Sequence, residues 1–287
     1  MNDDAEPTLC RSRAELREAQ LSGKALYGDD LGSDELRAWY EKEENAYIDL
    51  RNNFYATTNT NDQYDYEYQA LNDFHAISFL LDRRFGCCVA LGCAAGDDVT
   101  PLAPVVDRFV ALEPAERWWR TEIGGKPATY LKPQASGNID LPSRSADLAT
   151  SLGVLHHIPN VTHVVGEIAR VLRPRGLFIV REPISWMGDW RRPRAGLTAN
   201  ERGLPLTWFE HTVRSAGFTV VRRHLCMFRA VALLATRLGV SSPYNSRAVT
   251  VVDWLVSEAL RWNTRYRRDM IVKKIAPGSA FWILERT

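Results

Sequence analysis

The segment Val89-Ala-Leu-Gly-Cys-Ala-Ala-Gly96 constrains the fold of this chain more than any other part of the sequence. The run 87–91 is short and continuously apolar, as expected for a strand that is buried on both faces of a parallel sheet. Gly92 and Gly96 follow, and because glycine has no Cβ, a ligand can approach the backbone of this turn closely. The pattern predicts a ligand at the carboxyl end of the strand, over a helix N-terminus.

Strand and helix patterns alternate after this segment, as in parallel βαβ units with right-handed crossovers. We expect further strands at 109–112, 147–152, 177–180, 218–225 and 279–284. We expect helices at 70–81, 99–106, 160–172 and 205–216. The sequence therefore predicts an α/β fold built on a largely parallel sheet.

Three further motifs follow the glycine turn in order. Glu113 directly follows the strand 109–112, where a carboxylate can accept hydrogen bonds from both hydroxyls of a ribose. The next motif has two parts, the segment 137–142, with Gly137-Asn138 at its start, and the run 151–159, Ser-Leu-Gly-Val-Leu-His-His-Ile-Pro. The last is Val171-Leu-Arg-Pro-Arg-Gly176, which leads into the strand 177–180.

With the four motifs in this order, residues 85–225 and the last strand resemble the class I S-adenosylmethionine-dependent methyltransferases. The resemblance implies a three-layer Rossmann-like sheet of seven strands, whose last two strands form an antiparallel pair. It also implies S-adenosylmethionine (SAM) as the cofactor. The residues that would bind SAM are Gly92, Cys93, Ala94, Gly96, Glu113, Asn138 and Ser151.

The chain departs from the family pattern at three positions. Ala90 stands where the family often has an acidic residue, and Ala94 replaces a glycine. Asp97 or Asp98 could partly replace the missing carboxylate at the methionine end of SAM. Asn138 stands where an aspartate commonly faces the adenine, and its amide could still accept from the adenine amino group and donate to a ring nitrogen.

Transfer of a methyl group to a hydroxyl requires an aligned acceptor and a group that takes the hydroxyl proton. His156 and His157 follow the strand 147–152 at the carboxyl edge of the sheet, and histidine is suited to this role near neutral pH. The sequence does not decide between them, although His156 is the first choice. Glu182 ends the next strand and could bind the acceptor or act as the base. No cluster in the sequence has the spacing of a metal site, so a divalent metal is possible but has no support.

The organisation of the chain follows from these patterns. We expect a helical N-terminal cap over 1–75, a SAM-binding core over 76–228, a helical and basic insertion over 229–278 and a last strand at 279–287. Residues 1–45 carry a net charge of −6 and residues 181–287 a net charge of +10, within a chain whose net charge is +1. A long insertion at a sheet edge is usually functional, here as a lid or an acceptor site.

Composition narrows the class of protein. The apolar fraction of 45% and the charged fraction of 25% are those of a globular protein. The acidic N-terminus does not have the apolar core of a secretory signal. No apolar run in the sequence is long enough to span a membrane, so a cytoplasmic protein is expected. The five cysteines are odd in number and lack zinc-ribbon spacing, which predicts small buried residues rather than disulfides.

The function that the sequence favours is O-methylation of a hydroxyl on a small molecule, sugar or glycan, including an anionic acceptor. Tryptophans and arginines in the segment 181–194 suit such an acceptor. Three alternatives stay open. They are a nucleic-acid methyltransferase, which the near-zero net charge disfavours, an NAD-dependent oxidoreductase and an inactive SAM-fold subunit that binds a partner.

Overall fold

The computed structural model describes residues 12–54, 66–194 and 196–287. The α-helices are α1 (Arg13–Ser22), α2 (Ser33–Phe54), α3 (Gln69–His75), α4 (Val161–Val171), α5 (Leu206–Ser215), α6 (Arg229–Arg237), α7 (Arg247–Ala259) and α8 (Ile271–Lys274). Short 3-10 helices are η1 (Ile77–Phe79), η2 (Thr100–Leu102), η3 (Glu116–Trp118), η4 (Leu155–His157), η5 (Pro243–Asn245) and η6 (Arg261–Asn263). The strands are β1 (Cys88–Leu91), β2 (Phe109–Leu112), β3 (Glu122–Ile123), β4 (Lys126–Leu131), β5 (Ala146–Leu152), β6 (Leu172–Pro183), β7 (Phe218–Cys226) and β8 (Ser279–Arg286).

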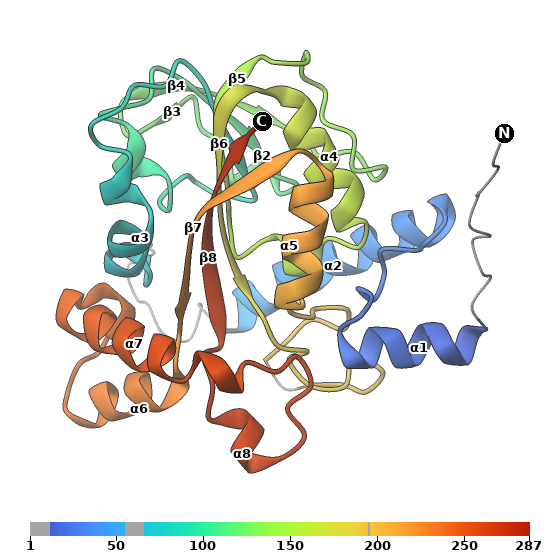
Figure 1. Cartoon of the computed structure of the whole chain (residues 1–287). Helices are drawn as coiled ribbons and strands as arrows, with labels where there is room; N and C mark the ends of the chain where they lie inside the picture. Colours follow the sequence, from blue (N-terminus) through green and yellow to red (C-terminus); the bar gives the residue numbers. More distant parts are fainter. Residues whose placement is uncertain (1–11, 55–65, 195) are drawn as a thin grey trace, which may run out of the picture.

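One mixed sheet runs through the molecule, with the strand order β3-β4-β2-β1-β5-β6-β8-β7 (Figure 1). The strands β4, β2, β1, β5 and β6 are parallel to one another. The strand β8 is antiparallel to both β6 and β7. The expected fold class is confirmed, and the sheet has eight strands instead of seven because the short β3 adds an antiparallel edge to β4.

Helices cover both faces of this sheet and make three layers. Val89 and Leu91 of β1 point to the face that packs against α4 and α5, whereas Cys88 and Ala90 point to the face of α3 and η1 (Figure 1). The alternation follows from the period of two along a strand, and both faces are apolar because both are covered. Among the described residues the four cysteines at 87, 88, 93 and 226 are buried and free, as predicted, whereas Cys10 lies outside the described residues.

Three details differ from the elements expected. The predicted helix at 99–106 is reduced to η2, because Pro104 lacks the N–H that a longer helix would need at this position. The predicted helix at 70–81 ends at His75 and continues as η1. β6 begins at Leu172, five residues before the apolar run that predicted it.

The segment between β7 and β8 leaves and re-enters the sheet at one edge. Cys226, the last residue of β7, is paired with Ser279, the first of β8, and Ser279 is also paired with Pro183 at the end of β6. The helices α6, α7 and α8 therefore lie at the edge where the parallel strands end, the lower end in Figure 1. Among the described helices, none is both long and apolar enough to cross a membrane.

Candidate active site

A cavity of about 390 Å³ lies at the carboxyl ends of β1, β2 and β5. The parallel register brings these ends together, since Leu91 is paired with both Leu112 and Ser151. Among the residues predicted to form the site, Gly92, Glu113, Asn138 and His157 line this cavity. Its volume is within the range of small-molecule sites. Cys93, Ala94, Gly96 and Ser151 are not part of the wall.

The glycine turn has a left-handed backbone conformation, which favours glycine. Gly92 and Gly96 have φ angles of +56° and +91°, and Ala94 between them has +48°. A Cβ on Gly92 would lie 2.7 Å from the side chain of Val154, which also lines the cavity. A Cβ on Gly96 would lie 2.7 Å from Ile123 of β3. Gly92 therefore shapes the cavity, whereas Gly96 allows β3 to pack against the turn.

The Glu113 carboxylate is fixed beneath the cavity. It is 3% exposed and accepts hydrogen bonds from the N–H groups of Ala94 and Ala115, each at 3.0 Å. Its position at the end of β2, bordering the cavity, is the one that the sequence predicted for a ribose-binding acid. Asn138 is exposed on the opposite side, with its side-chain oxygen 2.7 Å from Nε2 of His163.

Glu182 holds the turn that carries the two histidines. It is fully buried and accepts hydrogen bonds from the N–H groups of Val154, Leu155 and His156 and from the hydroxyl of Ser151. A further contact, 2.7 Å long, joins it to Nδ1 of His156. Both carboxylate oxygens are thus used to shape the turn at 153–157. These contacts favour a positioning role over one as a base.

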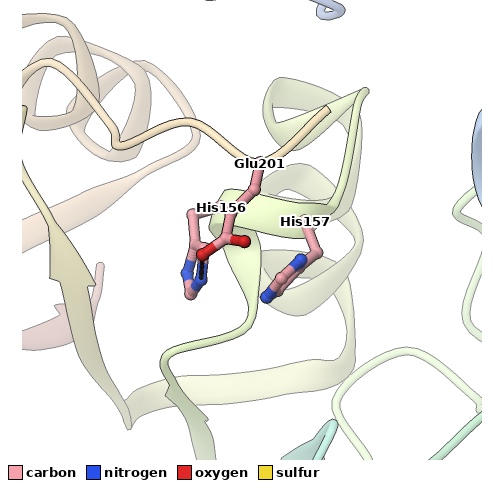
Figure 2. Close-up of side chains that lie close together, drawn as sticks. All are labelled: His156, His157 and Glu201. Atoms are coloured by element: carbon pink, nitrogen blue, oxygen red, sulfur yellow. Dashed lines mark ion pairs between the residues drawn. The ribbon is translucent and has the colours of Figure 1, made fainter. Parts of the chain in front are cut away.

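His156 is part of a buried ion-paired cluster. Its Nδ1 faces Glu182, and its Nε2 lies 3.5 Å from the carboxylate of Glu201 (Figure 2). Burial alone would lower the pKa of His156, but the hydrogen bonds and charges of Glu182 and Glu201 outweigh it and raise the pKa to about 9. Burial works the other way on Glu201, yet the contact with His156 lowers the pKa of Glu201 to about 2. His156 is thus held between two carboxylates, which favour its protonated form.

His157 lies beside His156 on η4 and lines the cavity (Figure 2). Its Nδ1 is 3.0 Å from the buried carboxylate of Glu43 on α2. Burial raises the pKa of Glu43, but hydrogen bonds from His157 and Thr198 outweigh it and lower that pKa. Glu43 therefore stays ionised and fixes the imidazole ring through Nδ1. This leaves Nε2 as the ring nitrogen available to other partners.

One ring nitrogen of each histidine and one oxygen of Glu201 lie within 4.8 Å of one another, close enough to surround a metal ion. Both ring nitrogens of His156, however, already form ion pairs, with Glu182 and with Glu201. Arg202 is also fully buried and donates to the backbone carbonyls of His156 and Ile158. The cluster thus contains its own cations, so its carboxylates do not need a metal ion to balance their charge.

Glu43, Glu201 and Arg202 are site residues that the sequence did not reveal. They lie on distant segments, and no local motif connects them to the histidines. Glu43 follows Trp39 by four residues, so the two side chains lie on one face of α2. The indole nitrogen of Trp39 donates a hydrogen bond to the backbone oxygen of His157. The face of α2 that carries both residues therefore packs against the turn that carries His157. Asp98, proposed as a substitute carboxylate, is buried, and its Oδ1 has no hydrogen-bond partner.

Comparison with known proteins agrees with this geometry. Residues 89–180 match the model of a family described as a methyltransferase domain. A putative sarcosine dimethylglycine methyltransferase from Galdieria sulphuraria has a similar structure, with 16% identity and a TM-score of 0.51 over 77% of this chain and 85% of that chain. A putative S-adenosylmethionine-dependent methyltransferase from Listeria monocytogenes has 13% identity and a TM-score of 0.51 over 77% of this chain and 100% of that chain. No curated protein shows significant sequence similarity to the chain.

The two structural similarities show the fold, and the family match runs from within β1 to within β6, so it includes the strands whose ends border the cavity. The match is to a methyltransferase domain and not to an NAD-dependent oxidoreductase. Residues 89–180 therefore match a methyltransferase domain, as the four motifs predicted, and S-adenosylmethionine is the cofactor that this match supports.

Proposed function

We propose that this protein transfers the methyl group of SAM to a hydroxyl of a small molecule, sugar or glycan. The observation that carries the proposal is that Glu113 and His157 line one cavity at the strand ends. The carboxylate of Glu113 is suited to bind a ribose, and the imidazole of His157 is held in place by the carboxylate of Glu43. The absence of a side chain at Gly92 leaves room for the ligand, since a Cβ there would collide with Val154. These features fit the cofactor.

The residues divide the work in the following way. Gly92, Glu113 and Asn138 bind the nucleoside part of SAM, and SAM supplies an electrophilic methyl group on a sulfonium. Nε2 of His157 takes the proton of the acceptor hydroxyl as the new bond to carbon forms. Glu43 holds Nδ1 of His157 and stabilises the imidazolium that results, as the carboxylate of a catalytic triad does. Both ring nitrogens of His156 face carboxylates and the residue does not line the cavity, so we assign the role to His157.

The cofactor assignment is tested by calorimetric titration with SAM, S-adenosylhomocysteine and NAD. We expect both adenosyl ligands to bind and NAD not to bind. Glu113→Ala should weaken adenosyl binding by at least about tenfold, because it removes the carboxylate that meets the ribose. Binding of NAD, or unchanged affinity in the variant, would contradict the assignment.

The reaction is tested by a screen of sugars, glycans and other hydroxyl compounds with methyl-labelled SAM. Once an acceptor is found, His157→Gln should lower kcat by about a hundredfold or more while SAM affinity stays unchanged. His211→Gln, a change at an exposed histidine on α5, is the matched control. Methylation confined to nitrogen, sulfur or nucleic-acid acceptors would refute the hydroxyl assignment. SAM binding without turnover on any acceptor would favour the inactive binding subunit.

A further inference from the structure

The insertion between β7 and β8 carries most of the exposed apolar side chains of the structure. Among the described residues, twelve large hydrophobic side chains are exposed, and ten of them lie between positions 233 and 275. The ten are Leu233, Leu234, Leu238, Val252, Leu255, Trp262, Met270, Ile271, Val272 and Ile275. Scattered apolar residues on a surface are ordinary, but a concentration of this kind indicates a surface that meets a partner.

The helix α7 exposes apolar residues and buries polar ones. Its polar residues Thr250, Asp253 and Ser257 are buried, whereas Val252 and Leu255 are half exposed. The exposed positions 248, 252, 255, 259 and 262 are spaced by three and four residues, so they form one stripe along the helix. A helix that lies on a protein surface normally turns such a stripe inward. Here the stripe faces outward and ends at Trp262, which is 69% exposed.

The charge of the insertion indicates the nature of the partner. Residues 229–275 contain nine basic and three acidic residues, a net charge of +6. One of the acids, Asp253, is buried and accepts hydrogen bonds from the N–H groups of Met227 and Phe228. Basic residues directly adjoin exposed apolar ones, as in Arg261-Trp262 and in Ile271-Val-Lys-Lys-Ile275. An apolar surface framed by arginine and lysine is complementary to the headgroups and upper acyl chains of an anionic membrane.

We propose that residues 229–275 form a docking surface for an anionic lipid membrane. The protein would lie on the bilayer, which requires no membrane-spanning helix. Because the insertion leaves and re-enters the sheet at the carboxyl edge, this docking would place that edge near the lipid surface (Figure 1). The proposal rests on the insertion alone and does not depend on the chemistry of the proposed function.

Two other partners explain these observations less well. In a symmetric dimer built on the insertion, each basic surface would face its own copy, and like charges would repel. Nucleic acid would satisfy the basic residues. It offers no partner for exposed aliphatic side chains such as Leu238, which is 77% exposed, and Ile271, which is 80% exposed. A membrane satisfies both kinds of side chain at once.

The test is co-sedimentation of the full chain with vesicles of phosphatidylcholine alone or mixed with phosphatidylserine. We expect binding to the mixed vesicles that weakens as the salt concentration rises. Leu255→Glu and Ile271→Glu should each lower the partition coefficient by about tenfold or more, because each places a charge in the apolar surface. Lys273→Gln with Lys274→Gln should reduce binding to the anionic vesicles. Leu81→Glu changes an equally exposed leucine outside the insertion and should have no effect.

Circular dichroism and urea unfolding of each variant show that its core is folded, so a loss of lipid binding can be assigned to the surface. The proposal is overturned if the wild-type chain does not bind the mixed vesicles, or if Leu81→Glu lowers binding as much as Leu255→Glu does. Sedimentation equilibrium provides a separate check. A dimer that Leu255→Glu dissociates, without lipid binding, would identify the surface as an interface between two copies.

Discussion

The ion pairs of His156 affect stability in a way that depends on pH. Its raised pKa means that the folded chain binds this proton more tightly than the unfolded chain does. The stabilisation is fully present below the ordinary histidine value of about 6.5 and is lost as pH rises through about 9. We expect the free energy of unfolding to fall by about 2–3 kcal/mol over this range in urea titrations.

The matched variant for this prediction is His156→Gln combined with Glu201→Gln. This double change removes the titrating histidine together with one of its two carboxylate partners, which lessens the uncompensated charge left in the interior. The fall in stability between pH 6.5 and 9 should become much smaller in this variant. His211→Gln should leave the fall unchanged. An equally steep fall in the double variant would show that another group titrates.

Asp98 also makes stability fall as pH rises, but here the cause is a buried acid that becomes charged. Burial raises its pKa to about 7, despite the opposing effect of Arg181, and its Oδ1 has no hydrogen-bond partner. Ionisation of an acid whose pKa is raised on folding destabilises the folded chain. The free energy of unfolding therefore falls as pH rises from about 4 to 7. Asp98→Asn keeps the shape of the side chain and removes this charge. It should raise the free energy of unfolding at pH 8 by about 1–3 kcal/mol and change little at pH 4.

At the scale of elements, the two glycines of the turn after β1 should respond differently to alanine. Gly96→Ala places a Cβ against Ile123 at a φ of +91° and should cost about 3 kcal/mol of stability, measured by urea unfolding. Gly92→Ala displaces Val154 from the cavity wall and should in addition weaken SAM binding by about tenfold. Equal SAM affinity in both folded variants would mean that Gly92 does not shape the cofactor site.

The elements that the sequence predicted well are those that are apolar on both faces. β1 and β2 are buried at every position, and such strands are apparent from composition alone. β4 was missed because it lies near the sheet edge, alternates in burial and contains Pro127, and β3 because it has only two residues. Glu43 was missed because it is 114 residues from His157 and only the fold of α2 joins them.

At the scale of the whole molecule, the helix α2 forms one side of the cavity at the strand ends. Arg37, Tyr40, Glu41 and Glu44 of this helix line the cavity, and Tyr40 donates a hydrogen bond to Asn160 at the start of α4. A ligand in the cavity is therefore enclosed between α2 and the strand ends. Binding of SAM should hold α2 in place, because opening of the helix would expose the ligand.

Hydrogen–deuterium exchange measures this coupling. At a SAM concentration about a hundred times its dissociation constant, the amides of residues 33–45 should exchange more slowly by up to about a hundredfold. The amides of α7 lie outside the cavity wall and provide the internal control, since their exchange should stay the same. Glu113→Ala should abolish the protection at that SAM concentration by weakening binding. Unchanged exchange in residues 33–45 of the saturated wild-type protein would mean that α2 is not part of the cofactor site.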